Sequence, residues 1–113
     1  IDILHDELPK AGLVFVRDCL VHLENDQIFR AIKNIIQSGS TYLAITTYPD
    51  LKTNFKSLQK DRWRPLNMSA RPFLLPEPIE LLDDRFTGNP PIHKNKYIGV
   101  WKISDISLSS KDI

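Results

Sequence analysis

The chain has 113 residues, the length of one domain or part of one, and its 15 basic and 14 acidic residues leave a net charge of +1. Its one cysteine excludes an intramolecular disulfide and a cysteine-based zinc cluster, and it fits a reduced, cytoplasmic setting. No apolar run approaches the ~18 residues of a membrane span, and no block of basic residues signals nucleic acid. Because the three histidines lack the spacing of metal ligands, we expect no metal site.

The first half of the chain predicts a strand, a helix and a second strand. Continuous apolar runs over 13–16 and 42–46 are typical of strands buried on both faces. Asn25 or Asp26 is expected to cap the helix between them, and Gly39 to end it. The two strands with their crossover helix predict a parallel α/β sheet. The apolar face of the helix follows from the spacing of Ile28, Phe29, Ile32, Ile35 and Ile36.

The second half of the chain is less regular. Residues 49–78 contain five prolines but too many apolar side chains for disorder, so we expect an ordered excursion that covers a site. Strands are predicted over 79–82 and 97–103, with a connector over 84–95. Because no long helix separates these two strands, we expect them to pair antiparallel.

Polar residues end both strands of the predicted parallel pair. Arg17 and Asp18 follow the first strand, and Thr46 and Thr47 end the second. Ligands of open α/β sheets bind beyond the carboxyl ends of the strands, so these four residues are expected along one rim. A local ion pair or a helix cap would also explain Arg17 and Asp18, and β-branched strand preference would explain the threonines.

Three short motifs and their order resemble a known family. Asp2, followed by Leu8-Pro9 and a buried strand, resembles an acidic residue, a spacer, "LP" and strand four. RDCLVHL resembles the segment after that strand, and WRPLN with PFLLPEP downstream looks like a signature of a bacterial-type subgroup with an uncertain substrate. The family is the class I S-adenosylmethionine-dependent methyltransferases, which close with an antiparallel strand pair whose last strand lies beside the fifth.

This resemblance implies a Rossmann-like three-layer α/β sandwich of class I methyltransferase type, with parallel strands followed by a C-terminal antiparallel hairpin. Residues 1–113 would form a single partial domain, from the end of strand three onward. The family's Gly-x-Gly cofactor loop does not occur in the sequence. We therefore expect the C-terminal half of a domain, which binds S-adenosylmethionine only weakly by itself. Without its first half it would be marginal, a homo-oligomer or dependent on a partner.

The resemblance also places residues around the cofactor. Asp2 would lie near the adenine amino group, because its carboxylate can accept a hydrogen bond from that group. The amide of Ile3 would meet an adenine ring nitrogen. Arg17 and Asp18 would lie beside the methionine part, with His22 on the following turn. From the residues alone, Asp2 is equally a solvated carboxylate near a chain end, and His22 is better explained as a histidine satisfied by backbone.

The acceptor side of the predicted site draws on Thr46, Thr47 and three residues of the excursion. The indole of Trp63 would stack on a flat or cationic group, although an anchor packed on the sheet is the interpretation we favour. Arg64 would grip an anion, or else anchor the loop. Asn67 would present its amide to a substrate, or else shape a turn.

Two functions follow from these expectations. The first is methyl transfer from S-adenosylmethionine to an acceptor, for which a small molecule is preferred because the sequence shows no basic stripe. The alternative is a non-catalytic methyltransferase-like binding or interaction module, suggested by the missing glycine loop. A nicotinamide-dependent Rossmann enzyme is disfavoured by the antiparallel end of the sheet.

Overall fold

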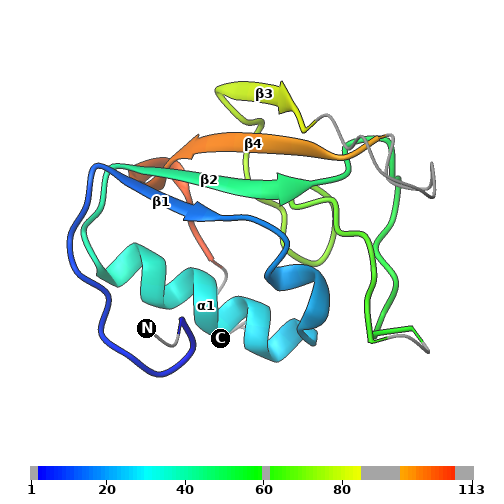
Figure 1. Cartoon of the computed structure of the whole chain (residues 1–113), viewed down its shortest axis with the longest axis horizontal. Coiled ribbons are helices and arrows are strands. Elements are labelled where there is room, and N and C mark those ends of the chain that lie inside the picture. Colours follow the sequence, from blue (N-terminus) through cyan, green and yellow to red (C-terminus); the bar gives the residue numbers. More distant parts are fainter. Residues whose placement is uncertain (1–2, 60–61, 85–94, 109–113) are drawn as a thin grey trace.

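The computed structural model describes residues 3–59, 62–84 and 95–108. Its four strands form one mixed sheet in the order β1-β2-β4-β3 (Figure 1). The predicted small α/β architecture is therefore confirmed. The elements in chain order are β1 (Leu13–Val16), the 3-10 helix η1 (Leu20–His22), the α-helix α1 (Asn25–Gln37), β2 (Tyr42–Thr47), β3 (Glu80–Asp83), β4 (Tyr97–Lys102) and the 3-10 helix η3 (Ile103–Asp105).

The strand directions bring four chain segments to one edge of the sheet. β1 and β2 are parallel, as predicted, and β4 is antiparallel to both β2 and β3. Thr47 and Asp83 both lie opposite Tyr97, so β2 and β3 end where β4 begins. The carboxyl ends of the three like-directed strands therefore share an edge, which is the position of ligand sites in α/β sheets. We call this edge the rim; it consists of residues 17–18, 46–48, 84 and 95–96.

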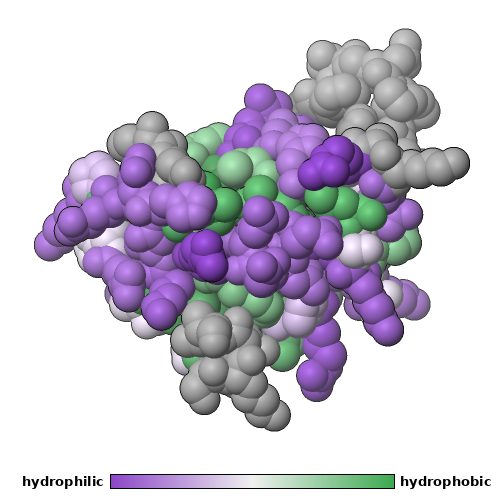
Figure 2. Space-filling view, turned by 90° about the horizontal axis from the view of Figure 1, so that it is seen from below, coloured by the Kyte–Doolittle hydropathy of each residue, from purple (hydrophilic) through white to green (hydrophobic). Residues whose placement is uncertain are grey.

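Helix α1 covers one face of the sheet (Figure 1). Its predicted apolar side is buried except for Ile36, which is half-buried, while Lys33 is exposed. Hydrophilic side chains predominate on the surface seen from this side (Figure 2). Gly39 follows the helix with φ 71°, a left-handed conformation that favours glycine and was expected of the helix stop.

The predicted helix cap was wrong by one or two residues. The cap is Glu24, whose backbone N–H donates to Oε1 of Gln27 at 3.0 Å. Asn25 is the first helical residue instead, and its Oδ1 accepts a hydrogen bond from Arg64 at 2.6 Å. The side chain of Asn25, which was predicted to cap the helix, thus accepts a long-range hydrogen bond instead.

The excursion, residues 49–78, packs on the same face as α1. Its described residues form no helix or strand, as the sequence predicted, but Leu66, Met68, Phe73 and Leu75 belong to the core. The rings of Phe29 and Phe73 lie 5.4 Å apart between centroids. This segment is therefore ordered by burial and not by regular backbone hydrogen bonding.

The opposite face of the sheet corrects the expectation that β1 is buried on both sides. Leu13 and Phe15 are 51% and 58% exposed, and Tyr42 and Leu82 on the same face are also exposed. β1 is an edge strand of the sheet, and the described residues place no helix over this face. The described part of the chain thus forms two layers, and the third layer of the predicted sandwich is not among them. No helix within it is long and apolar enough to span a membrane.

Candidate functional site

Four charged side chains meet at the rim. The guanidinium of Arg17 donates to both carboxylate oxygens of Asp84, at 3.0 Å from Nε and 2.9 Å from Nη2. Nζ of Lys96 lies 2.6 and 2.7 Å from the oxygens of Asp18 and 3.5 Å from Oδ2 of Asp84. We call these four residues the rim network. Its two cations and two anions balance, so the rim carries ordered charge without net charge.

Sequence reasoning found half of this network. Arg17 and Asp18 lie at the rim as predicted, but they are 4.0 Å apart, and their close partners come from residues 67 and 78 positions further along the chain. Asp84 and Lys96 were missed. The sequence did contain a signal for them: Asp84 directly follows β3, and Lys96 directly precedes β4. In the predicted antiparallel hairpin these two positions lie at the same edge of the sheet.

The threonines at the end of β2 hold backbone in place. Oγ1 of Thr46 accepts the backbone N–H of Asp18 at 2.8 Å, and Asp18 has a φ of 56°, in the left-handed region. Oγ1 of Thr47 accepts the N–H of Met68 at 3.1 Å. Both threonines are buried. Thr46 therefore fixes the loop that carries Asp18, and Thr47 fixes the excursion.

The electrostatics of the rim network follow from its contacts. Hydrogen bonds from Arg17 are the main cause that lowers the pKa of Asp84; burial opposes them, and the charge of Lys96 adds to them. The same hydrogen bond to Asp84 raises the pKa of Arg17. The side chains of Arg17 and Asp18 are about half exposed, at 50% and 43%, whereas Lys96 is buried. One cation and one anion of the network are therefore accessible from solvent.

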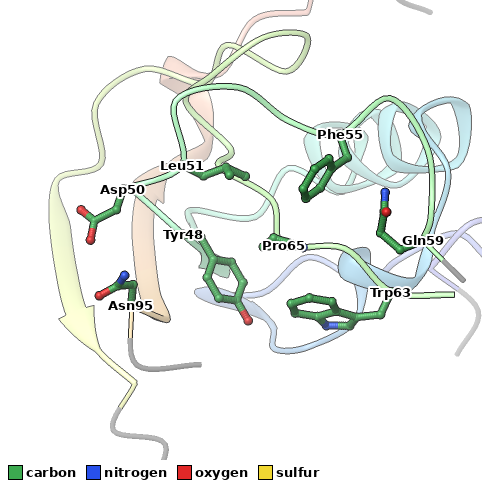
Figure 3. Close-up of a pocket in the computed structure, with 8 residues that line it drawn as sticks. All are labelled: Tyr48, Asp50, Leu51, Phe55, Gln59, Trp63, Pro65 and Asn95. Atoms are coloured by element: carbon green, nitrogen blue, oxygen red, sulfur yellow. The ribbon is translucent and has the colours of Figure 1, made fainter. Parts of the chain in front are cut away.

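A pocket of about 550 Å³ lies beside the rim (Figure 3). Tyr48 directly follows β2 and Asn95 precedes β4, and the remaining walls come from the excursion. The rings of Tyr48 and Trp63 meet edge to face, with centroids 6.1 Å apart and an angle of 88°. We call this cavity the aromatic pocket. Its lining is Tyr48, Asp50, Leu51, Phe55, Gln59, Trp63, Pro65 and Asn95.

Tyr48 links the aromatic pocket to the rim network. Burial raises the pKa of its phenol to about 12, and the charges of Asp18 and Asp84 contribute in the same direction. The hydroxyl therefore stays protonated at neutral pH, where it can form hydrogen bonds but cannot act as a base. Sequence reasoning did not single out Tyr48, although an aromatic residue immediately after the paired threonines was a usable signal.

Trp63 and Arg64 are adjacent in the chain but have different surroundings. Trp63, expected as an anchor, packs partly buried against the core and also lines the aromatic pocket. Arg64 is fully buried at 0% exposure, and its guanidinium donates to the carbonyls of Phe55 and Leu23 as well as to Oδ1 of Asn25. Arg64 thus ties the excursion to the start of α1, which is the anchor alternative that the sequence left open for it.

Asn67 shapes the excursion from within. Its Nδ2 donates to the carbonyls of Leu51 at 2.8 Å and Pro49 at 3.3 Å, and its Oδ1 accepts from the N–H of Ser69 at 3.0 Å. The amide is therefore fully used by backbone, which is the turn-residue alternative. Asn67 and Thr47 also line a second cavity of about 440 Å³, on the side of β3.

Of the remaining predicted residues, Asp2 lies outside the described residues, and neither Ile3 nor His22 belongs to the rim. The carbonyl of Ile3 accepts a hydrogen bond from Asn34 of α1 at 2.9 Å, and Ile3 packs against the core. Nδ1 of His22 lies 3.1 Å from the carbonyl of Arg62 on the surface. The ring therefore contacts backbone, as expected of a histidine satisfied by backbone. The described residues contain no group of three or more potential metal ligands among His, Cys, Asp and Glu.

Comparisons of the chain with protein-family models, with curated proteins and with solved structures give no match. The features that bear on function are therefore the sheet, the rim network and the aromatic pocket.

Proposed function

We propose that the chain is the C-terminal part of the catalytic domain of a class I S-adenosylmethionine-dependent methyltransferase, which transfers a methyl group to a small-molecule acceptor. The observation that carries the proposal is the strand order. A parallel pair joined by a helix is followed by a last strand, β4, inserted between β2 and β3 and antiparallel to both. The family closes its sheet in this way, whereas dinucleotide-binding Rossmann domains continue with parallel strands.

The rim supports the proposal because its charges fit the cofactor. The amino-acid end of S-adenosylmethionine carries an ammonium and a carboxylate, and the rim offers Asp18 and Arg17 with half-exposed side chains. The cofactor's sulfonium supplies an electrophilic methyl group. The chain's own residues position the acceptor and exclude water, which supplies much of the rate in such a reaction. The aromatic pocket lies next to these charges and would hold the acceptor.

The uncovered face of β1 also supports the proposal. A strand with free edge groups and exposed Leu13 and Phe15 is what remains when a neighbouring strand and a helical layer are supplied by another segment. In the proposed enzyme that segment would be the half that carries the Gly-x-Gly loop. The same half would complete the predicted three-layer sandwich.

The test is a calorimetric titration of the full-length protein, as its gene encodes it, with S-adenosylmethionine and with its demethylated product. We expect binding, and a loss of affinity in Asp18→Asn, because the cofactor's ammonium loses its carboxylate. Asp26→Asn removes an exposed carboxylate of α1 that is not part of the rim network, and it should leave binding unchanged. A thermal-shift assay with nicotinamide dinucleotides separates the disfavoured Rossmann alternative. Absence of cofactor binding by the full-length protein would overturn the proposal.

The second candidate is a non-catalytic binding module with a methyltransferase-like sheet. Two observations favour it: the sequence contains no Gly-x-Gly loop, and the rim charges already pair with one another. The intact mass of the natural protein, read together with its coding sequence upstream of Ile1, discriminates the two candidates. A preceding strand followed by Gly-x-Gly favours the enzyme, and a reading frame that starts at Ile1 favours the binding module.

A further inference from the structure

The aromatic pocket has two chemically different ends. Figure 3 shows Asp50 and Asn95 at one end, Phe55 and Trp63 at the other, and Tyr48 between them. Its volume of about 550 Å³ is within the range of small-molecule sites. A ligand that fills it would therefore have a polar group at one end and an apolar, preferably flat, body at the other.

Among the described residues, the wall of the aromatic pocket carries charge of one sign. Asp50 is the only charged side chain among the described residues that line it. The carboxylates of Asp18 and Asp84 act on Tyr48 from the rim side. The cations next to them, Arg17 and Lys96, are bound to those same carboxylates. An anionic ligand would meet the carboxylate of Asp50 and no cation on the described wall, whereas a cationic ligand would be attracted by that carboxylate.

The aromatic walls add to this preference. Rings attract cations through their negative faces, and edge-to-face pairs such as Tyr48 and Trp63 leave ring surface available to a ligand. Arg62 and Arg64 flank Trp63 in the sequence, and neither lines the cavity: Arg62 is exposed, and Arg64 is buried in the interior. The exposed Lys52 and Lys56 of the same segment do not line it either.

We propose that the aromatic pocket binds a small organic cation, a protonated or quaternary amine with an apolar body. Its nitrogen lies at the end of the pocket formed by Asp50 and Asn95, and its body lies against Phe55 and Trp63. As the identity of a methyl acceptor, this assignment rests on the proposed function. As a binding site it stands independently, because it depends only on the rings and charges of the pocket.

Three probes with the same phenyl ring test the assignment: 2-phenylethylamine, 2-phenylethanol and 3-phenylpropionate. Each is titrated into the ¹⁵N-labelled full-length protein. We expect the amine to bind about two- to fivefold more tightly than the alcohol, the size of an exposed cation–π contact, and the carboxylate to bind most weakly. The indole signal of Trp63 should shift. That of Trp101 should not, because this indole is buried and donates to the carbonyl of Pro76, which makes it an internal control.

Two variants locate the effect. Asp50→Asn should abolish the preference for the amine over the alcohol and leave alcohol binding unchanged. Trp63→Leu should weaken both, because it removes a ring while keeping apolar bulk. Glu80→Gln removes an exposed carboxylate from the other end of β3 and should change nothing. Equal affinity for amine and carboxylate, a preference that survives in Asp50→Asn, or no binding of any probe would each overturn the assignment.

The cofactor titration on the same preparation keeps the two proposals apart. Cofactor binding without an amine preference overturns the pocket assignment alone. An amine preference without cofactor binding overturns the methyltransferase and leaves the pocket as the site of a binding module.

Discussion

β1 and the excursion differ in opposite directions from what their sequences suggest. β1 is a regular strand of four apolar residues, yet two of its side chains are more than half exposed. The excursion has no regular structure in its described residues, yet Arg64, Leu66 and Met68 are among the most completely buried side chains of the protein. Regular backbone and burial are therefore separate properties here, and burial is the one that carries stability.

β1 and the excursion differ in how many of their apolar side chains have packing partners. β1 pairs on one edge and packs on one face, so half of its apolar surface has no partner among the described residues. The excursion packs on the same face of the sheet as α1, and side chains from both segments fill the core. Buried donors and acceptors along it are satisfied by Arg64, Asn67 and Thr47.

The largest expected effect compares two leucines. Leu66→Ala should lower the free energy of unfolding by about 2–5 kcal/mol, because a side chain that is 1% exposed leaves a cavity. Leu13→Ala should change it by no more than about 0.5 kcal/mol, since half of that side chain is already in water. Urea denaturation measures both. Equal costs would mean that the excursion is no better packed than the edge strand.

Two glycines sharpen the same contrast. A Cβ added at Gly99 would lie 2.5 Å from Cη2 of Trp101, so Gly99→Ala should destabilise the protein by about 1–3 kcal/mol through overpacking. No described atom lies within 4 Å of a Cβ added at Gly12, next to β1, and Gly12→Ala should be close to neutral. Thermal unfolding followed by tryptophan fluorescence reports both changes. A tolerated Gly99→Ala would contradict the close approach of Trp101 to the β4 backbone.

A smaller effect concerns the polar tie between the end of β1 and the end of β3. Because the folded-state pKa of Asp84 is lowered, its contribution to stability is present above the unfolded value near 3.9 and is lost as pH falls through the lower folded value. Asp84→Asn should therefore cost up to about 1 kcal/mol at pH 7, a size limited by the half-exposed Arg17, and should flatten the stability curve below about pH 4. Urea midpoints from pH 2 to 7 measure this. The exposed Glu80→Gln serves as the control, and an unchanged acid limb in Asp84→Asn would count against the tie.

The smallest change in stability is expected at Phe15, with a larger change in association. The 113-residue chain should self-associate through the free edge and apolar face of β1, and Phe15→Lys should shift it toward monomer, because edge charges oppose strand pairing. Phe55→Lys, which removes an exposed ring from the excursion, should leave association unchanged. Light scattering with size exclusion distinguishes these cases. A stable monomer of the unchanged chain would show that the uncovered face needs no partner.

Local patterns were sufficient where one period dominates a segment. The bounds of β1 were predicted to the residue, and the apolar spacing of α1 and the stop at Gly39 were also correct. The antiparallel end of the sheet followed from the absence of a long helix between the last two strands. Such features depend on neighbours in sequence, so a sequence read in isolation contains them.

Pairings across the chain were beyond the sequence. Arg17 and Asp18 suggested each other as partners, but the sheet brings Asp84 and Lys96 to them. Trp63 and Arg64 are adjacent in a segment without periodicity, so no pattern decides which of them faces inward. The guanidinium is inside because three acceptors converge there, from Leu23, Asn25 and Phe55.

The sequence by itself determined the strand, helix and strand of the first half, the irregular but apolar excursion, and the placement of polar residues at strand ends. Periodicity and turn chemistry act over a few residues and are visible in the chain. The tertiary structure decided which face of β1 is uncovered, which charges form the rim network and which rings line the aromatic pocket. These depend on the insertion of β4 between β2 and β3, which joins segments that are far apart in the chain.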